Sequence, residues 1–201
     1  MRKILATLLV VFMTIAALGA AALVYVRSTG LAARAEPGAF EAALARAVRS
    51  FGVPRDVKDM PNPVPQTPEV IAEGLAHYAD HCAVCHGNDG SGNTQVGQGT
   101  WPKAPDMRQE ATQRLSDGEL FYIIEEGVRF TGMPGWSTGT PEGTAASWHL
   151  VHFIRHLPRM TSDEMERMGR LTPRSPDEIR QEIEAEQFLQ GGAPAPPVHE
   201  H

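Results

Sequence analysis

Cys82, Cys85 and His86 form a Cys-x-x-Cys-His motif, and the chain has no other cysteine. Thiolates and imidazoles are metal ligands, and two thiols at this spacing can also form a reversible disulfide. A Cys-x-x-Cys-His motif is in addition the pattern through which a haem is attached covalently to a protein. The motif therefore predicts one of three sites, which are a redox-active dithiol, part of a zinc site, or a haem.

The surroundings of the motif favour the haem. Positions three apart on a helix lie on the same face, so both sulfurs can reach the two vinyl groups on one porphyrin edge. His86 follows directly and can reach the iron from one side. A thioredoxin-like dithiol would need a βαβ pattern, and a structural zinc site would need a second Cys/His pair; the sequence has neither. We therefore predict one covalently bound haem c with His86 as an iron ligand.

Met133 is the best candidate for the second axial ligand of the iron. It lies in residues 131–136, which read Thr-Gly-Met-Pro-Gly-Trp, and small residues let a loop approach a flat cofactor closely. Methionine more often fills a gap in a core, but a Gly/Pro loop is an unusual place for that role. Met107, also in a loop with prolines, is the alternative ligand. The methionines of the tail, Met160, Met165 and Met168, are predicted to lie on the surface.

An uncharged apolar run at residues 4–26 follows Arg2 and Lys3. At 1.5 Å per residue, a helix of this length crosses the ~30 Å hydrocarbon layer of a membrane. We therefore predict a retained membrane anchor in residues 1–27, with a cleaved signal peptide as the alternative. The two basic residues place the N-terminus in the cytoplasm and the rest of the chain outside.

Residues 28–66 are predicted to hold a short helix and a proline-rich linker. The helix covers residues 36–51, and it either packs on the next domain or lies against the membrane surface. The linker is expected to be stiff and extended, and to let the following domain swing between partners. The apolar residues that recur at helical spacing are Phe40, Leu44, Ala47, Val48 and Phe51.

Residues 67–160 are predicted to form an all-α domain with long loops at residues 87–105 and 129–140. Such loops are unusual in a compact core unless they wrap a large cofactor. Residues 161–201 are predicted to be an acidic, partly helical tail with a disordered end. The expected helix starts are Thr67 with Pro68, a capping box of Ser116 and Glu119, Thr140 or Thr144, Thr161 with Glu164, and Ser175 with Pro176.

The domain at residues 67–160 resembles a small class I cytochrome c, and among these the mono-haem domains of bacterial cbb3-type oxidases. The resemblance implies the cytochrome c fold, in which an N-terminal helix crosses a C-terminal one. The residues that carry the resemblance are Tyr78, the motif at 82–86 with Gly87, Asp89-Gly90-Ser91-Gly92, Pro105, Met133-Pro134, Trp148, Val151 and Phe153.

The resemblance also implies how further residues surround a haem. Gly74 and Tyr78 would meet the last helix near Trp148 and Phe153. The carbonyl of Pro105, or else of Pro102, would accept the other ring N–H of His86, which would orient the ring. Side chains that could meet the haem propionates, with an ordinary surface or core role as the alternative, are Trp101, Arg108, Arg129 and Trp136.

The sequence thus predicts a single-electron carrier, not an enzyme, with His86 and Met133 as the iron ligands. A haem-based gas sensor or haem enzyme with a labile sixth ligand is the alternative. The net charge of −6 does not favour nucleic acid as a partner. We expect redox proteins at the membrane as partners, no small-molecule substrate, and a location on the outer side of a bacterial inner membrane. His149, His152 and His156 share one helix face and could bind a metal ion. We expect instead that they are ordinary half-exposed histidines, which is the commoner case.

Overall fold

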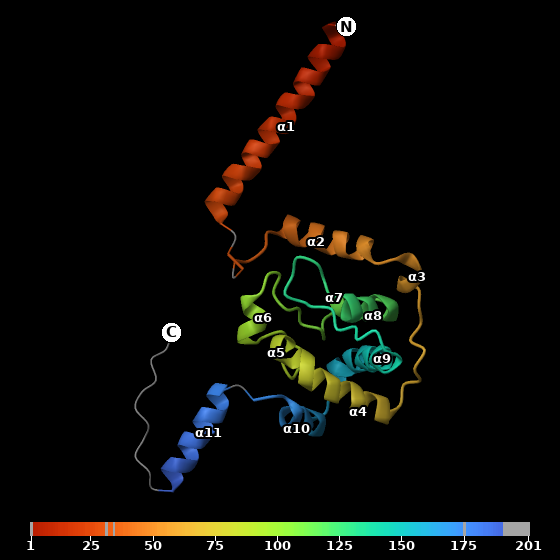
Figure 1. The fold of residues 1–201 in the computed structure, drawn as a ribbon, viewed down its shortest axis with the longest axis vertical. Helices are drawn as coiled ribbons and strands as arrows, with labels where there is room; N and C mark the ends of the chain where they lie inside the picture. The colour runs from red at the N-terminus through yellow and green to blue at the C-terminus, as the bar shows by residue number, and fades with distance from the viewer. Residues whose placement is uncertain (1, 31, 34, 175, 191–201) are drawn as a thin grey trace. The chain divides into compact units, whose positions relative to one another are not determined.

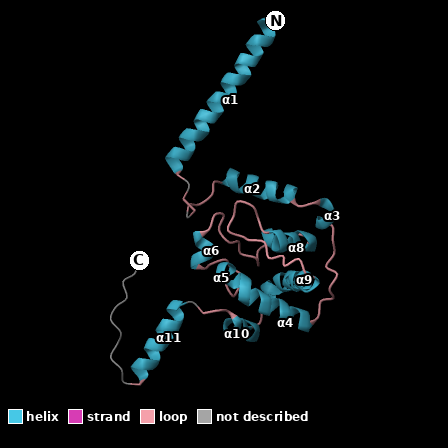
Figure 2. Ribbon diagram, viewed as in Figure 1, coloured by secondary structure: helices cyan, strands magenta, loops and turns pink. Residues whose placement is uncertain are grey.

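The computed structural model describes residues 2–30, 32–33, 35–174 and 176–190, and every regular element within them is a helix (Figures 1 and 2). This confirms the predicted all-α class. The chain separates into two units, Met1–Glu36 and Pro37–His201. The elements are α1 (Arg2–Thr29), α2 (Ala39–Gly52), α3 (Arg55–Lys58), α4 (Pro68–His77), the π-helical turn η1 (Tyr78–Cys82), α5 (Ala83–His86), α6 (Gln95–Gly99), α7 (Glu110–Gln113), α8 (Asp117–Glu126), α9 (Pro141–His156), the 3₁₀ turn η2 (Leu157–Arg159), α10 (Ser162–Leu171) and α11 (Pro176–Leu189).

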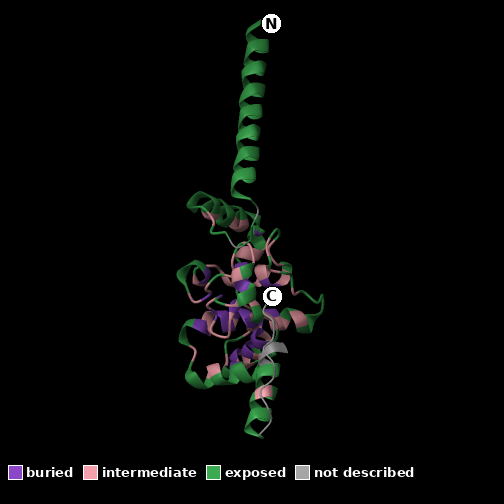
Figure 3. Ribbon diagram, turned by 90° about the vertical axis from the view of Figure 1, so that its left-hand side faces the viewer, coloured by how far each residue is buried: buried purple, intermediate pink, exposed green. Residues whose placement is uncertain are grey.

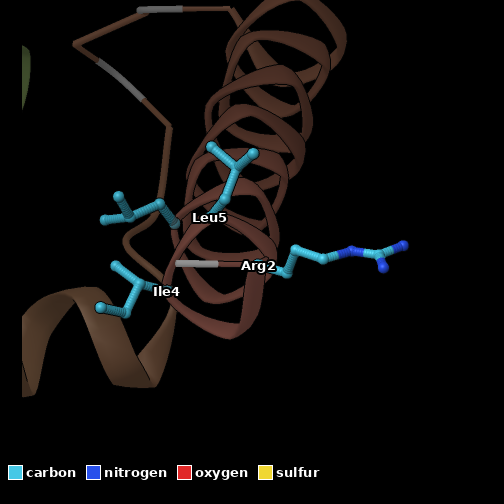
Figure 4. A pocket seen from close by; sticks show the side chains of 4 residues that line it. Arg2, Ile4 and Leu5 are labelled. Atoms are coloured by element: carbon cyan, nitrogen blue, oxygen red, sulfur yellow. The ribbon is translucent and has the colours of Figure 1, made fainter.

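Helix α1 has 28 residues, a mean hydropathy of 2.5 over its most apolar stretch, and no buried residue. Its length and composition suit a membrane-spanning helix, and an N-terminal signal sequence has the same properties. The pocket in Figure 4 is lined by Arg2, Ile4, Leu5 and Leu8, which all belong to α1 itself. It is therefore a hollow on the outside of one helix and not a binding site.

Helices α4 and α9 pack against one another more extensively than any other pair of elements. The two backbones approach closely at Gly74, where an added Cβ would lie 2.4 Å from the His149 carbonyl oxygen and 2.8 Å from the Phe153 Cβ. One turn further along, the rings of Tyr78 and Phe153 lie 5.1 Å apart. The expected crossing of the first and last helices of the domain is present. Trp148 differs from the expectation, because it stacks on Phe121 of α8 at 4.1 Å.

We expect Gly74→Ala to lower the free energy of unfolding of the haem-loaded protein by about 1–3 kcal/mol, since the new methyl group overpacks the α4–α9 contact. Gly169→Ala is the control, because Gly169 lies in α10 with nothing within 4 Å of an added Cβ. That variant should be neutral or more stable by up to about 1 kcal/mol. Denaturant unfolding measures both. Equal stability of the two variants would contradict the close approach.

The core of the second unit is built around the α4–α9 contact (Figure 3). Its largest fully buried side chains are Tyr78, Phe153, Leu75, Met168 and Val151. The prediction that Met168 lies on the surface is therefore wrong. Helix α10 is amphipathic and turns Met168 inward, where it joins the same core cluster.

Side-chain caps start four of the helices where the sequence predicts them. The Thr67 hydroxyl accepts from the Val70 N–H, and Ser116 with Glu119 forms a capping box. Thr161 with Glu164 forms a second one. Of the two alternatives for α9, Thr140 is the N-cap. Helix α11 begins at Pro176, while Ser175 and the predicted disordered end at 191–201 lie outside the described residues.

The predicted swinging linker is wrong for residues 55–64, because they are bonded to the helical domain. The Ser116 hydroxyl donates to the Lys58 carbonyl at 2.6 Å, and the Asn62 amide donates to the Trp148 carbonyl at 3.0 Å. The His152 ring lies 2.7 Å from the Val64 carbonyl oxygen. These bonds hold the segment on α8 and α9. The proline-rich composition alone therefore does not predict whether the segment moves relative to the domain.

Candidate haem site

The Cys-x-x-Cys-His motif spans the junction of η1 and α5. Cys82 ends the π-helical turn, and Cys85 and His86 lie in the short helix that follows. No disulfide joins the two cysteines. Burial raises the pKa of Cys82 to about 12 and also raises the pKa of Cys85. A redox-active dithiol depends on a lowered thiol pKa, so this environment does not favour that alternative.

A structural zinc site is not favoured either. Such a site needs about four converging ligands. Within the described residues, no three His, Cys, Asp or Glu side chains gather in a way that could hold a metal ion. Of the three predicted sites, this leaves the haem. In a haem the porphyrin supplies most of the iron ligands, so the protein needs to add few.

His86 is suited to bind an iron as a neutral imidazole. Its side chain is buried, with a 9% exposed fraction for the residue. Burial lowers the pKa of the ring, and the backbone carbonyl of Pro105 opposes this by raising it. The Nδ1 atom makes no hydrogen bond of ordinary geometry with the described residues. Of the two prolines considered, Pro105 is the one whose carbonyl affects the pKa of His86, and its hydrogen bond to the ring stays a prediction.

The loop after the motif folds back onto it. The carbonyl of His86 accepts from the Gly92 N–H at 2.7 Å, and the carbonyl of Cys85 accepts from the Thr94 hydroxyl at 3.0 Å. Gly97 packs so closely that an added Cβ would lie 2.1 Å from the Cys85 carbonyl oxygen. The predicted loop at 87–105 is therefore interrupted by the short helix α6, which the glycine-rich sequence does not indicate.

The loop that carries Met133 is fixed to the end of α8. The Val128 N–H donates to the Met133 carbonyl at 3.0 Å, and the Trp136 N–H donates to the Ile124 carbonyl at 2.9 Å. Residues 129–140 form no helix, as predicted, and Met133 is half-buried. Met107, in contrast, is 7% exposed and belongs to the core cluster. Its burial gives Met107 the gap-filling role that methionine usually has.

Trp136 connects the methionine loop to the haem-binding motif. Its ring stacks on His81 with the centroids 4.9 Å apart, and His81 directly precedes Cys82. A pocket of about 610 Å³ opens beside this pair. Trp136 and Cys82 both line this pocket, and a contact of Trp136 with a haem propionate stays a prediction. The sequence indicated no role at a haem for the other residues that line the pocket, which are His77, His81, Thr138, Thr140, Glu142, Gly143, Ala146, Ser147 and Leu150.

Arg108 has a well-defined set of carboxylate partners. Its guanidinium lies 2.9 Å from Asp106 and 3.0 Å from Asp89. The hydrogen bond from Arg108 to Asp106 lowers the pKa of that carboxyl to about 2. These two carboxylates compete for the group that was expected to meet a propionate. Trp101 is half-buried and Arg129 is exposed, and neither lines the pocket beside Cys82. Contacts of these three residues with propionates stay predictions.

The three histidines on α9 have three different partners. His149 lies 2.9 Å from Glu73, His152 lies 2.7 Å from the Val64 carbonyl oxygen, and His156 lies 2.9 Å from Glu164. Each imidazole ties α9 to another part of the domain. This arrangement fits the ordinary structural role and gives no support to a shared metal site.

The helical fold and the Cys-x-x-Cys-His motif are those expected of a c-type cytochrome domain. Residues 69–154 match the family model described as "Cytochrome C oxidase, cbb3-type, subunit III". The chain is also similar to the cbb3-type cytochrome c oxidase subunit CcoP of Cereibacter sphaeroides, with 33% identity over 76 residues. That match covers 38% of this chain and 24% of the relative, so the chain spans about a quarter of the relative's length. The resemblance to cbb3-type cytochrome c domains is confirmed, and haem c is the cofactor of this family of domains.

Proposed function

We propose that this chain carries single electrons between membrane-associated redox proteins through one haem c. The observation that carries the proposal is the pair of cysteines, not joined by a disulfide, next to a buried imidazole in a domain that matches the cytochrome c family model. The iron of a bound haem supplies a one-electron Fe(III)/Fe(II) couple. In the proposed site, Cys82 and Cys85 hold the haem covalently, and His86 and Met133 bind the iron.

The protein residues have separate tasks in this proposal. Pro105 orients the His86 ring through its carbonyl, which favours a fixed ligand geometry. Met133, on a loop fastened to α8, would be the second ligand of the iron of a bound haem and would leave no site for a substrate on it. A thioether ligand stabilises ferrous iron and raises the reduction potential relative to a second histidine. We therefore assign the chain as a carrier, or as the carrier subunit of a larger oxidoreductase, and not as an enzyme.

Carbon monoxide binding to the reduced, full-length protein tests this assignment. If Met133 occupies the sixth position, the visible spectrum of the reduced protein should change little on exposure to the gas. Rapid binding of one carbon monoxide per haem would instead support the gas sensor or haem enzyme. No contact in the described residues favours that second function.

The proposed domain division keeps residues 1–27 as the anchor, 28–66 as the connecting segment, 67–160 as the cytochrome c domain and 161–201 as the tail. In this arrangement α1 spans the bacterial inner membrane and the haem lies on the periplasmic side. An anchor would raise the effective concentration of the domain near its redox partners.

Deleting residues 1–27 and supplying a cleavable signal is expected to give a soluble, haem-loaded protein. The full-length chain should stay in the membrane fraction through washing with high salt and with carbonate, because α1 is apolar along its length. Sedimentation followed by haem staining of both fractions measures this. Release of the full-length chain by salt would contradict the anchor.

A further inference from the structure

Helix α2 turns its apolar side chains away from the domain. Phe40, Leu44, Val48 and Phe51 recur at helical spacing on one face. Their exposed fractions are 80%, 52%, 61% and 92%. A surface helix normally packs its apolar face against the core. The apolar face of α2 instead points away from the domain, and no described residue covers it.

The polar side of α2 faces the domain. Arg49 and Ser50 are half-buried, and the Lys58 ammonium donates to the Ser50 hydroxyl at 3.1 Å. The same ammonium lies 2.8 Å from the buried Glu119 at the start of α8. Burial lowers the pKa of Arg49, and the charge of Glu119 opposes this. These contacts hold the inner side of α2 on charged groups of the domain and present the outer, apolar side to the surroundings.

Chain connectivity indicates what covers the apolar face. Nine residues separate the end of α1 at Thr29 from the start of α2 at Ala39. A segment of that length reaches at most about 30 Å, so α2 cannot lie far from a membrane that α1 spans. Its 14 residues extend about 21 Å, too short to cross the bilayer. Phe and Leu on one side with Arg on the other is the composition of a helix that lies in the membrane interface.

A second copy of the chain is a less suitable cover. The four exposed side chains offer on the order of 500 Å² of apolar surface. A stable protein interface buries about 800 Å² on each partner. A bilayer has no such minimum, because binding scales with the apolar area that is inserted.

We propose that α2 lies in the headgroup region of the membrane that α1 enters, with Phe40, Leu44, Val48 and Phe51 toward the acyl chains. The inference rests on the proposed anchor role of α1. It goes beyond that role, because the bonds through Lys58 to Ser50 and Glu119 link α2 to α8. A membrane-bound α2 would thus give the haem domain a preferred orientation on the bilayer.

Single-cysteine labelling of the full-length protein in phospholipid vesicles tests the proposal. In the haem-loaded chain Cys82 and Cys85 are thioethers, so a fluorescent thiol label attaches only at an introduced cysteine. Leu44→Cys and Val48→Cys place the label on the apolar face. Ala45→Cys is the matched control, since Ala45 is equally exposed but lies about 100° around the helix from Leu44. The unsubstituted chain should take up no label.

Labels at positions 44 and 48 should emit at shorter wavelength in vesicles, and lipids with a quencher in their acyl chains should quench them. The label at position 45 should respond to an aqueous quencher instead. Water-accessible labels at all three positions, in chains that stay with the vesicles after a carbonate wash, would overturn the inference alone. Chains that are washed off would overturn the anchor and the inference together. Protection at positions 44 and 48 without lipid quenching, dependent on protein density, would assign the face to a second copy.

Discussion

Replacing both Cys82 and Cys85 with alanine is expected to abolish covalent haem attachment completely. The two thioether bonds are the only covalent links that the chain can offer, because it has no other cysteine. Haem staining after denaturing electrophoresis measures the attachment. The wild-type band should stain, and the band of the double variant should not.

Val84→Ala is the matched control for this pair of substitutions. Val84 lies between the two cysteines and is 59% exposed, so its loss removes little packing. That variant should keep its covalent haem. Acidified organic solvent provides a second measurement, because it extracts a haem that is held only by its iron ligands. Extraction of haem from the wild-type protein would sink the covalent assignment.

Met133→Ala is expected to open the iron while leaving the haem attached. The sixth position then becomes available, so the reduced protein should bind carbon monoxide. The reduction potential should fall by on the order of 0.1 V, within the ~0.8 V range that axial ligands span, since ferrous iron loses its thioether ligand. The weak sulfur-to-iron charge-transfer band of the oxidised protein should disappear.

Met107→Leu serves as the control for the methionine ligand. Met107 is buried in the core, so leucine preserves its volume and limits the loss of stability to below about 1.5 kcal/mol. This variant should keep the charge-transfer band and the insensitivity to carbon monoxide. If Met107→Leu changes the iron coordination and Met133→Ala does not, the assignment must move to Met107. Bis-histidine ligation is harder to arrange, because no histidine lies between Asn88 and Glu142.

Local signals in the sequence predicted much of the fold and the centre of the site. A capping hydroxyl accepts a hydrogen bond from an N–H three residues away. Ser116 and Thr161 could therefore be predicted as N-caps without knowledge of the tertiary structure. The motif at Cys82 and Cys85 is equally local. The Gly74 contact could be expected only from the resemblance to a known fold, because it joins two helices far apart in the chain.

The features that sequence analysis missed depend on long-range partners. Met168 is buried because the amphipathic α10 packs on the core, although the acidic sequence around it suggests a surface. The partners of Arg108 are Asp106, two residues away, and Asp89, which only the folded loop brings near. The spacing in α2 revealed an apolar face, but its direction depends on contacts of the folded chain, in which Lys58 donates to Ser50 and pairs with Glu119.

A spectroelectrochemical titration of the purified full-length chain tests the central claim most directly. We expect one haem c per chain and a single reversible transition with the one-electron slope of about 59 mV per tenfold change in the ratio of oxidised to reduced protein. The spectra should be those of a six-coordinate, low-spin iron in both oxidation states. A chain without haem, or a transition with the two-electron slope of about 30 mV that a dithiol gives, would contradict it.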